Sequence, residues 1–210
     1  MAKFPEPPPA SELASLGAEV HVLPRGTCIW RVYFQAGAHP TTWEQFRAWG
    51  PTEARFDHHL PPPRAQERMI LYGATGPGAA VTAVAEVFQA DRTVERVRRA
   101  PTWVAFNLRE ELRLLDLTGT WPTRAGASMA LTTGQRARAR RWYQAIYQAF
   151  PQVDGLYYGS SMHANQPCVA LYERALRAMP AHPVFHRMLS DPTVLTLLKN
   201  ACGEVNYFLG

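Results

Sequence analysis

Runs of apolar and β-branched residues divide the chain into strand candidates. The clearest is Cys28–Phe34, where β-branched and aromatic residues dominate. Shorter apolar runs predict five further strands. These cover residues 69–72, 103–108, 112–117, 153–158 and 168–172.

Other segments repeat their apolar residues at helical spacing. Residues 132–150 carry an apolar side chain every three or four positions, which predicts a long helix capped by Thr132 or Thr133. A glycine-rich turn at residues 73–78 precedes a mostly apolar helix that runs from residue 79 to about residue 90.

Three weaker patterns predict short helices. The first covers residues 11–16 with Ser11 as its cap, and another covers residues 192–201. Residues 41–49 read as one or two helical turns that begin at Thr41 or Thr42. The proline run at residues 61–63 removes backbone donors, so the segment before it is expected to be irregular.

Strands and helices are interleaved without strict alternation, which favours an α+β fold over a doubly wound parallel sheet. We expect one domain of mixed or antiparallel strands flanked by helices, because 210 residues with 47% hydrophobic content suit a single core. Residues 1–24 read as a proline-rich N-terminal extension and residues 25–210 as the folded domain.

Composition narrows the classes of function. No apolar run reaches the roughly 18 residues of a membrane span and the first residues carry no secretory signal pattern, so a cytoplasmic protein without membrane contact is expected. The net charge of +5 suggests nucleic acid, but nearly all 22 basic residues are arginines, which weakens that interpretation. Arginine clusters at residues 92–99 and 136–141 keep a basic nucleic-acid-binding module as the alternative of a different class.

Glu86 is the one charge in an apolar helical segment, so its carboxylate is a candidate for a cleft. Periodicity alone favours a plainer interpretation, in which Thr82, Glu86, Gln89 and Thr93 form the solvated stripe of an amphipathic helix. Neither alternative is excluded by the sequence.

Several familiar motifs are missing. The turn at residues 73–78 matches neither a dinucleotide fingerprint nor a P-loop. The side chains of the adjacent His58 and His59 diverge, and Pro183 disrupts the helix that would place His182 and His186 on one face, so no metal is expected. Ser160 lacks the surroundings of a hydrolase nucleophile.

Five segments, taken in order, resemble the RES family, which is named for its characteristic Arg, Glu and Ser. The resemblance covers about residues 28 to 175. It rests on Ile29-Trp30-Arg31-Val32-Tyr33, Ala54-Arg55-Phe56-Asp57, Leu71-Tyr72-Gly73-Ala74, Ala85-Glu86-Val87 and Asp154-Gly155-Leu156-Tyr157-Tyr158-Gly159-Ser160.

The resemblance implies a fold similar to ADP-ribosyltransferases and a toxin that consumes NAD. In that interpretation Glu86 steadies the cationic ribose as the nicotinamide bond breaks, and Arg31 and Arg55 hold the pyrophosphate. Tyr72 packs on the nicotinamide or its ribose, and Ser160 orients a polar group of the ligand.

The resemblance leaves several points open. The family's serine corresponds either to Ser160 or to Thr133. The acceptor is water, phosphate or a protein side chain, so ADP-ribosylation of a specific protein is the alternative activity. NAD is expected as a substrate and no cofactor is expected. The implied partner is a cognate helix-turn-helix antitoxin.

Overall fold

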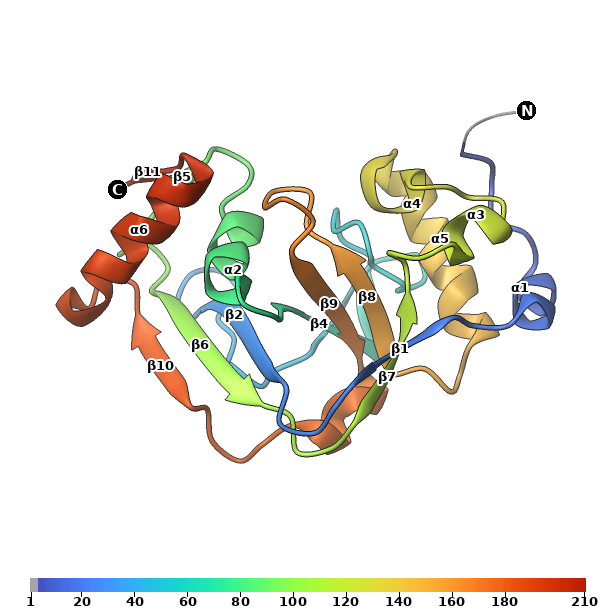
Figure 1. Ribbon diagram of the computed structural model, residues 1–210, viewed down its shortest axis with the longest axis horizontal. Coiled ribbons are helices and arrows are strands. Elements are labelled where there is room, and N and C mark those ends of the chain that lie inside the picture. Colours follow the sequence, from blue (N-terminus) through green and yellow to red (C-terminus); the bar gives the residue numbers. More distant parts are fainter. Residues whose placement is uncertain (1–3) are drawn as a thin grey trace.

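The computed structural model describes residues 4–210, in which a mixed β-sheet separates two groups of helices (Figure 1). The sheet order is β1-β7-β8-β9-β4-β2-β6-β10, and β3 pairs with β4. The strands of this sheet are β1 (Val20–Leu23), β2 (Cys28–Phe34), β3 (Arg47–Gly50), β4 (Arg64–Ala74), β6 (Pro101–Asn107), β7 (Leu112–Asp116), β8 (Gly155–Gly159), β9 (Pro167–Tyr172) and β10 (Phe185–Met188).

Neighbouring strands of this sheet run antiparallel except β7 and β8, which are parallel. A parallel pair requires a long crossover, and the chain between these strands supplies three helices for it. They are α3 (Trp121–Arg124), α4 (Ala130–Thr133) and α5 (Arg136–Ala149). The architecture confirms the predicted α+β class with mixed strands.

The helices gather at two ends of the sheet. Figure 1 shows α1 (Ala10–Leu16) beside the crossover helices, while α2 (Ala79–Val87) and α6 (Leu195–Val205) lie at the other end. The remaining elements are short: 3₁₀ turns η1 (Glu173–Ala178) and η2 (Pro192–Val194), and a small parallel sheet of β5 (Thr93–Val94) and β11 (Phe208–Leu209). No helix in residues 4–210 is long and apolar enough to cross a membrane.

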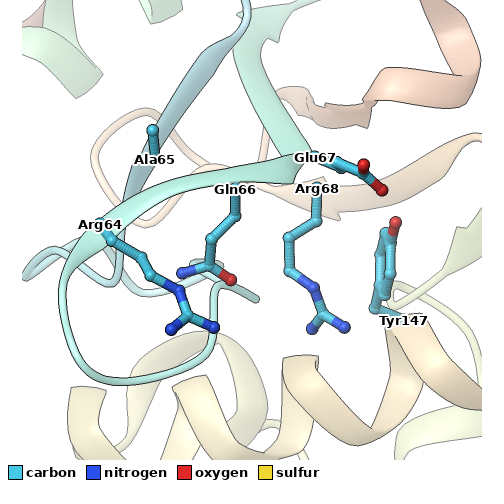
Figure 2. A pocket seen from close by; sticks show the side chains of 6 residues that line it. All are labelled: Arg64, Ala65, Gln66, Glu67, Arg68 and Tyr147. Atoms are coloured by element: carbon cyan, nitrogen blue, oxygen red, sulfur yellow. The ribbon is translucent and has the colours of Figure 1, made fainter.

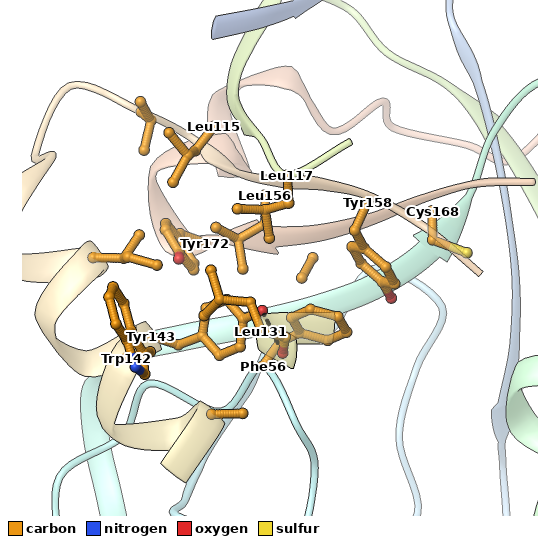
Figure 3. Packing of buried hydrophobic residues seen from close by; sticks show 14 of the residues in the cluster. Phe56, Leu115, Leu117, Leu131, Trp142, Tyr143, Leu156, Tyr158, Cys168 and Tyr172 are labelled. Atoms are coloured by element: carbon orange, nitrogen blue, oxygen red, sulfur yellow. Dashed lines mark hydrogen bonds between the residues drawn. The ribbon is translucent and has the colours of Figure 1, made fainter. Parts of the chain in front are cut away.

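Three apolar clusters hold these layers together. The largest packs α5 and the start of α2 against β4, β8 and β9, and Figure 3 shows its aromatic centre from Trp142 to Tyr158. A second cluster lies on the opposite face of the sheet and contains Ile29, Leu71 and Phe106. The third packs the later part of α2 and α6 against Val32 and Trp103. Helix α2 is therefore fixed between the sheet and α6.

The predicted strands agree with the structure better than the predicted helix boundaries do. The bounds of β2 are those predicted, and β6, β7, β8 and β9 lie where apolar runs place them. The short strand predicted at residues 69–72 is the inner part of the eleven-residue β4. The outer half of β4 is polar because it faces loop residues and solvent. A search for apolar runs therefore does not detect this half of the strand.

Several helix boundaries were predicted wrongly. Residues 47–50 form β3, because their backbone pairs with β4, and residues 41–46 contain only a single turn at residues 43–44, so the helical turns predicted at residues 41–49 are wrong. The long helix begins only at Arg136, since Thr132 and Thr133 belong to the separate helix α4. Ser11 lies inside α1 and does not cap it.

The proline-rich segment packs on the domain. Phe4 is buried beside Trp142, whose indole Nε1 donates to the carbonyl of Pro5 at 2.9 Å. Glu6 forms ion pairs with Arg138 and Arg141. Residues 1–3, with which the predicted extension begins, lie outside the described residues.

Candidate functional site

Glu86 lies in the last turn of α2 and points at the loop that follows β8. Its Oε1 accepts a hydrogen bond of 2.5 Å from the hydroxyl of Ser160. Thr82, one turn earlier, is fully buried. The solvated-stripe interpretation of this helix is therefore wrong, because Thr82 and Glu86 face the protein and the other two residues of the stripe, Gln89 and Thr93, lie beyond the end of α2.

The loop between β8 and β9 is built around Ser160. The Oγ of Ser160 accepts from the backbone amides of Met162 at 3.1 Å and His163 at 3.0 Å while it donates to Glu86. Ala164 and Asn165 take positive φ angles of 43° and 58° at the turn of this loop. The serine hydroxyl is thus fixed by three contacts and aimed at the carboxylate.

Arg55 reaches the same region from the irregular segment between β3 and β4. Its Nη1 donates to the carbonyl of Gly134, just after α4, and its charge acts on Glu86. The segment is anchored by Asp57, whose carboxylate accepts from the backbone and hydroxyl of Thr52 at 2.6 and 2.8 Å. A fixed loop therefore brings a cation near the carboxylate.

Burial controls the protonation of Glu86. Loss of solvent raises the pKa of this carboxyl above its ordinary value, and hydrogen bonds from Ser160 and the Met162 amide together with the charge of Arg55 oppose the rise. The pKa of Arg55 is lowered, chiefly by burial. A shifted carboxylate beside a cation is typical of functional sites.

Aromatic residues of the largest apolar cluster lie close to these groups. Tyr158 lies 4.0 Å from Phe56 between ring centroids, and its pKa is raised by burial and by the charge of Glu86, among other groups. Tyr72 lies on the same face of the sheet and is partly open, but its hydroxyl is buried near Arg47. The ring of Tyr72 packs with Phe56 at the edge of the largest apolar cluster, and its hydroxyl lies near Arg47.

Arg31 is not brought to this site. Side chains alternate along β2, so Arg31 shares a face with Ile29 of the second cluster, whereas α2 packs on the face of Val32. Its Nη1 donates to the carbonyl of Trp43 at 3.0 Å, and burial lowers its pKa to about 10. The sheet therefore separates Arg31 from Glu86.

Of the two residues considered for the serine position, Ser160 contacts Glu86 and Thr133 does not. The exposed Thr133 donates its hydroxyl to the carbonyl of Met129 at 3.0 Å within α4. Thr133 adjoins Gly134, the partner of Arg55, so it lies at the edge of the region.

Two surface hollows lie elsewhere. One of about 380 Å³ follows the outer half of β4, where Arg64, Gln66 and Arg68 point the same way beside Tyr147 (Figure 2). The other, of about 580 Å³, runs along α5 and Pro8–Pro9. Neither is lined by Glu86. Gln66 and Arg68 bond to carbonyls of the segment that carries Arg55, so this strand supports that segment.

Sequence reasoning missed His163. Its ring bridges Thr82 and Glu204 at 2.8 Å each, which joins the serine loop to two helices. Its place three residues after Ser160 is the only signal in the sequence, and spacing in a loop does not reveal such contacts. His58 and His59 are fully buried, with the Nδ1 of His59 2.5 Å from Asp57.

Comparison with known proteins places this chain in a family. The RES domain family matches residues 29–193, and the chain belongs to that family. The fold is also similar to a chain in the crystal structure of the MbcT-MbcA toxin-antitoxin complex of M. tuberculosis. The two share 17% identity at a TM-score of 0.59, over 91% of this chain and 96% of that one. Among curated proteins, no sequence matches this chain.

Proposed function

We propose that this chain is the toxin of a toxin–antitoxin pair and that it cleaves the bond between nicotinamide and ribose in NAD. Membership of the RES family and the likeness to a chain of a toxin–antitoxin complex support the first part. The contact between the largely buried Glu86 and Ser160, beside Arg55, carries the second.

The reaction requires a negative charge near the sugar. When the bond breaks, its electron pair leaves with the nicotinamide nitrogen, which becomes neutral, and the ribose carbon becomes cationic. A fixed carboxylate stabilises that developing charge more than it stabilises the substrate. An oxygen of water or phosphate then bonds to the carbon and gives up a proton. We assign the carboxylate to Glu86.

The other groups bind and orient. Ser160 holds the carboxylate in one rotamer, and Arg55 carries the fork of donors that suits a pyrophosphate oxygen. The partly open ring of Tyr72 offers a face to the nicotinamide or its ribose. Arg31 has no part in this assignment, because it lies across the sheet.

A cognate antitoxin is the proposed protein partner, and the family resemblance implies a helix-turn-helix type. A nucleic-acid module is less well supported because arginines of both clusters are used internally. Arg138 and Arg141 pair with Glu6, and Arg99 stacks on Phe34 with 4.1 Å between the guanidinium carbon and the ring centroid.

The direct test is release of nicotinamide from NAD by the purified chain, with water alone and with added phosphate. We expect release by the native chain and a loss of about 100-fold or more in Glu86→Gln, since removal of one electrostatic stabiliser costs on that order. Glu12→Gln is the matched control, because it removes the same charge from the exposed face of α1.

Two outcomes would contradict the proposal. Full release by folded Glu86→Gln would remove Glu86 from the chemistry. Absence of release with either acceptor would exclude simple degradation, and labelled NAD in a lysate would then test transfer to one protein band.

A further inference from the structure

The chain after the family match covers the helix that carries Glu86. The match ends at residue 193, and α6 begins at Leu195. Leu198, Ala201 and Cys202 are buried in one cluster with Val84 and Ala85 of α2. Strand β11 then pairs with β5, so this C-terminal segment, residues 195–210, is tied down beyond α6.

Tyr207 contacts the backbone next to Glu86. Its hydroxyl donates to the carbonyl of Ala85 at 3.0 Å in a buried position. Ala85 belongs to the last turn of α2, where carbonyls lack partners inside the helix. The bond therefore fixes the peptide unit from which Glu86 projects.

His163 joins the C-terminal segment to the serine loop. Its amide donates to the Oγ of Ser160, its Nδ1 lies 2.8 Å from the hydroxyl of Thr82, and its Nε2 lies 2.8 Å from Glu204 of α6. The Thr82 hydroxyl lies within hydrogen-bond distance of both the Gly78 carbonyl and Nδ1 of His163. A carboxylate only accepts, so the contact with Glu204 is a hydrogen bond donated by Nε2.

The His163 ring is nearly enclosed, since its side chain is 10% exposed, while that of Glu204 is 55% exposed. An exposed carboxylate adds little to overall stability. It does, however, hold the ring at the angle that meets Thr82, and through the backbone of the loop it fixes Ser160. We propose that Glu204 and Tyr207 are positioning residues of the candidate site, which act on Ser160 through His163 and on Glu86 through Ala85.

This inference rests on the proposed NAD cleavage. Small displacements of reacting groups cost large factors in rate. We therefore expect Glu204→Ala to lower kcat for nicotinamide release about 10-fold, with KM changed less than about 2-fold. Glu204→Gln keeps an oxygen acceptor for Nε2 and is expected to retain most of the native kcat. Glu12→Gln on α1 remains the charge-matched control.

A second pair of variants tests the other side of the ring. Thr82→Val removes the hydroxyl that His163 contacts while Thr82→Ser keeps it, so kcat is expected to fall in the first and to recover in the second. Tyr207→Phe is expected to lower kcat in the same way. A merely structural role would lower the thermal midpoint without this difference between conservative and non-conservative changes.

Hydrogen exchange separates this inference from the proposed function. Amides of residues 160–166 are expected to exchange faster in Glu204→Ala than in Glu204→Gln, whether or not the chain cleaves NAD. Suppose that the native chain releases no nicotinamide. Equal exchange in the two variants then overturns the role of the contact between His163 and Glu204, and faster exchange in Glu204→Ala supports it. If the native chain is active, a native kcat in folded Glu204→Ala overturns the inference.

Discussion

Glu86 combines two demands on one side chain: it has to be ionised to act, and its burial opposes ionisation. Burial raises the pKa of this carboxyl above its ordinary value of 4.5, although Ser160, Met162 and Arg55 limit the rise. The acidic limb of the pH profile of kcat/KM, which reports ionisations of the free protein, should therefore lie above pH 4.5, with activity lost as the pH falls through it. Nicotinamide release across pH 4 to 8, measured under conditions where the fold persists, checks this expectation. A limb at or below the ordinary value would contradict it.

Ser160 should also affect the pH at which Glu86 ionises. Its hydroxyl bond lowers the pKa of Glu86, so Ser160→Ala is expected to move the acidic limb to higher pH and to reduce kcat. The change also leaves the amides of Met162 and His163 without their acceptor, at a cost of about 1 to 3 kcal/mol in the free energy of unfolding.

Thr133→Ala is the comparison, because Thr133 is exposed and bonds only to Met129 of its own helix. It should leave the limb in place. A shift in Thr133→Ala with none in Ser160→Ala would reverse the assignment of the serine position.

At the scale of elements, the segment between β3 and β4 depends on one buried carboxylate. Burial alone would raise the pKa of Asp57, but the hydrogen bond with His59, the charge of Arg47 and two bonds from Thr52 hold it far below its ordinary range. Asp57→Asn would place an amide among these donors. We expect a loss of about 3 kcal/mol in the free energy of unfolding, since breaking a buried pair costs that much.

Urea denaturation measures this loss. Glu53→Gln in the same segment is the control, because the Glu53 side chain is 87% exposed and its ion pair with Arg140 should contribute less than about 1 kcal/mol. Equal stability of the two variants would contradict the anchoring role of Asp57.

The sequence predicts helices and strands correctly where the apolar pattern is strong. The prediction fails where contacts between distant segments determine the local structure. The bounds of β2 follow from its β-branched and aromatic residues alone. Strand β3 is fixed by its pairing with β4, and nothing in residues 47–50 shows that pairing. Helix α4 ends at Gly134, whose carbonyl accepts from the distant Arg55, a contact that the local sequence does not show.

The same limit applies to the site. Glu86, Arg55 and Ser160 were found by resemblance and are brought together by the fold. Arg31 was assigned from the same resemblance, but the alternation of β2, visible in the sequence, gives no information about which face α2 would cover. Helix α2 covers the face of β2 that carries Val32, because Val32 and Val84 are buried together there.

At the scale of the whole molecule, arginines hold distant segments in place. Arg174 donates to the carbonyls of Phe150 and Val153, and Arg177 pairs with Asp154 at 2.6 Å next to β8. The net charge of +5 therefore reflects internal contacts as well as surface, which reduces its value as an indicator of nucleic acid.

The response of the whole fold to acid should depend on His58. This ring is fully buried, stacks 4.4 Å from Tyr147, and lies 4.5 Å from Tyr172. Its two ring nitrogens have no hydrogen-bond partner among residues 4–210. Burial first, and then the charges of His59, Arg68 and Arg174, hold its pKa far below 6.5, against a smaller opposite effect of Asp57.

His58 therefore stays neutral in the folded protein at pH values where it is protonated in the unfolded chain, below about pH 6.5. The free energy of unfolding consequently decreases as the pH falls. One such group contributes a slope of about 1.4 kcal/mol per pH unit between about pH 6 and pH 4, before the ordinary range of aspartate is reached. His58→Phe keeps an aromatic ring in the stack and should flatten this slope in urea denaturation, while His39→Phe on the exposed surface should not. Equal slopes in the two variants would mean that other groups control the acid response.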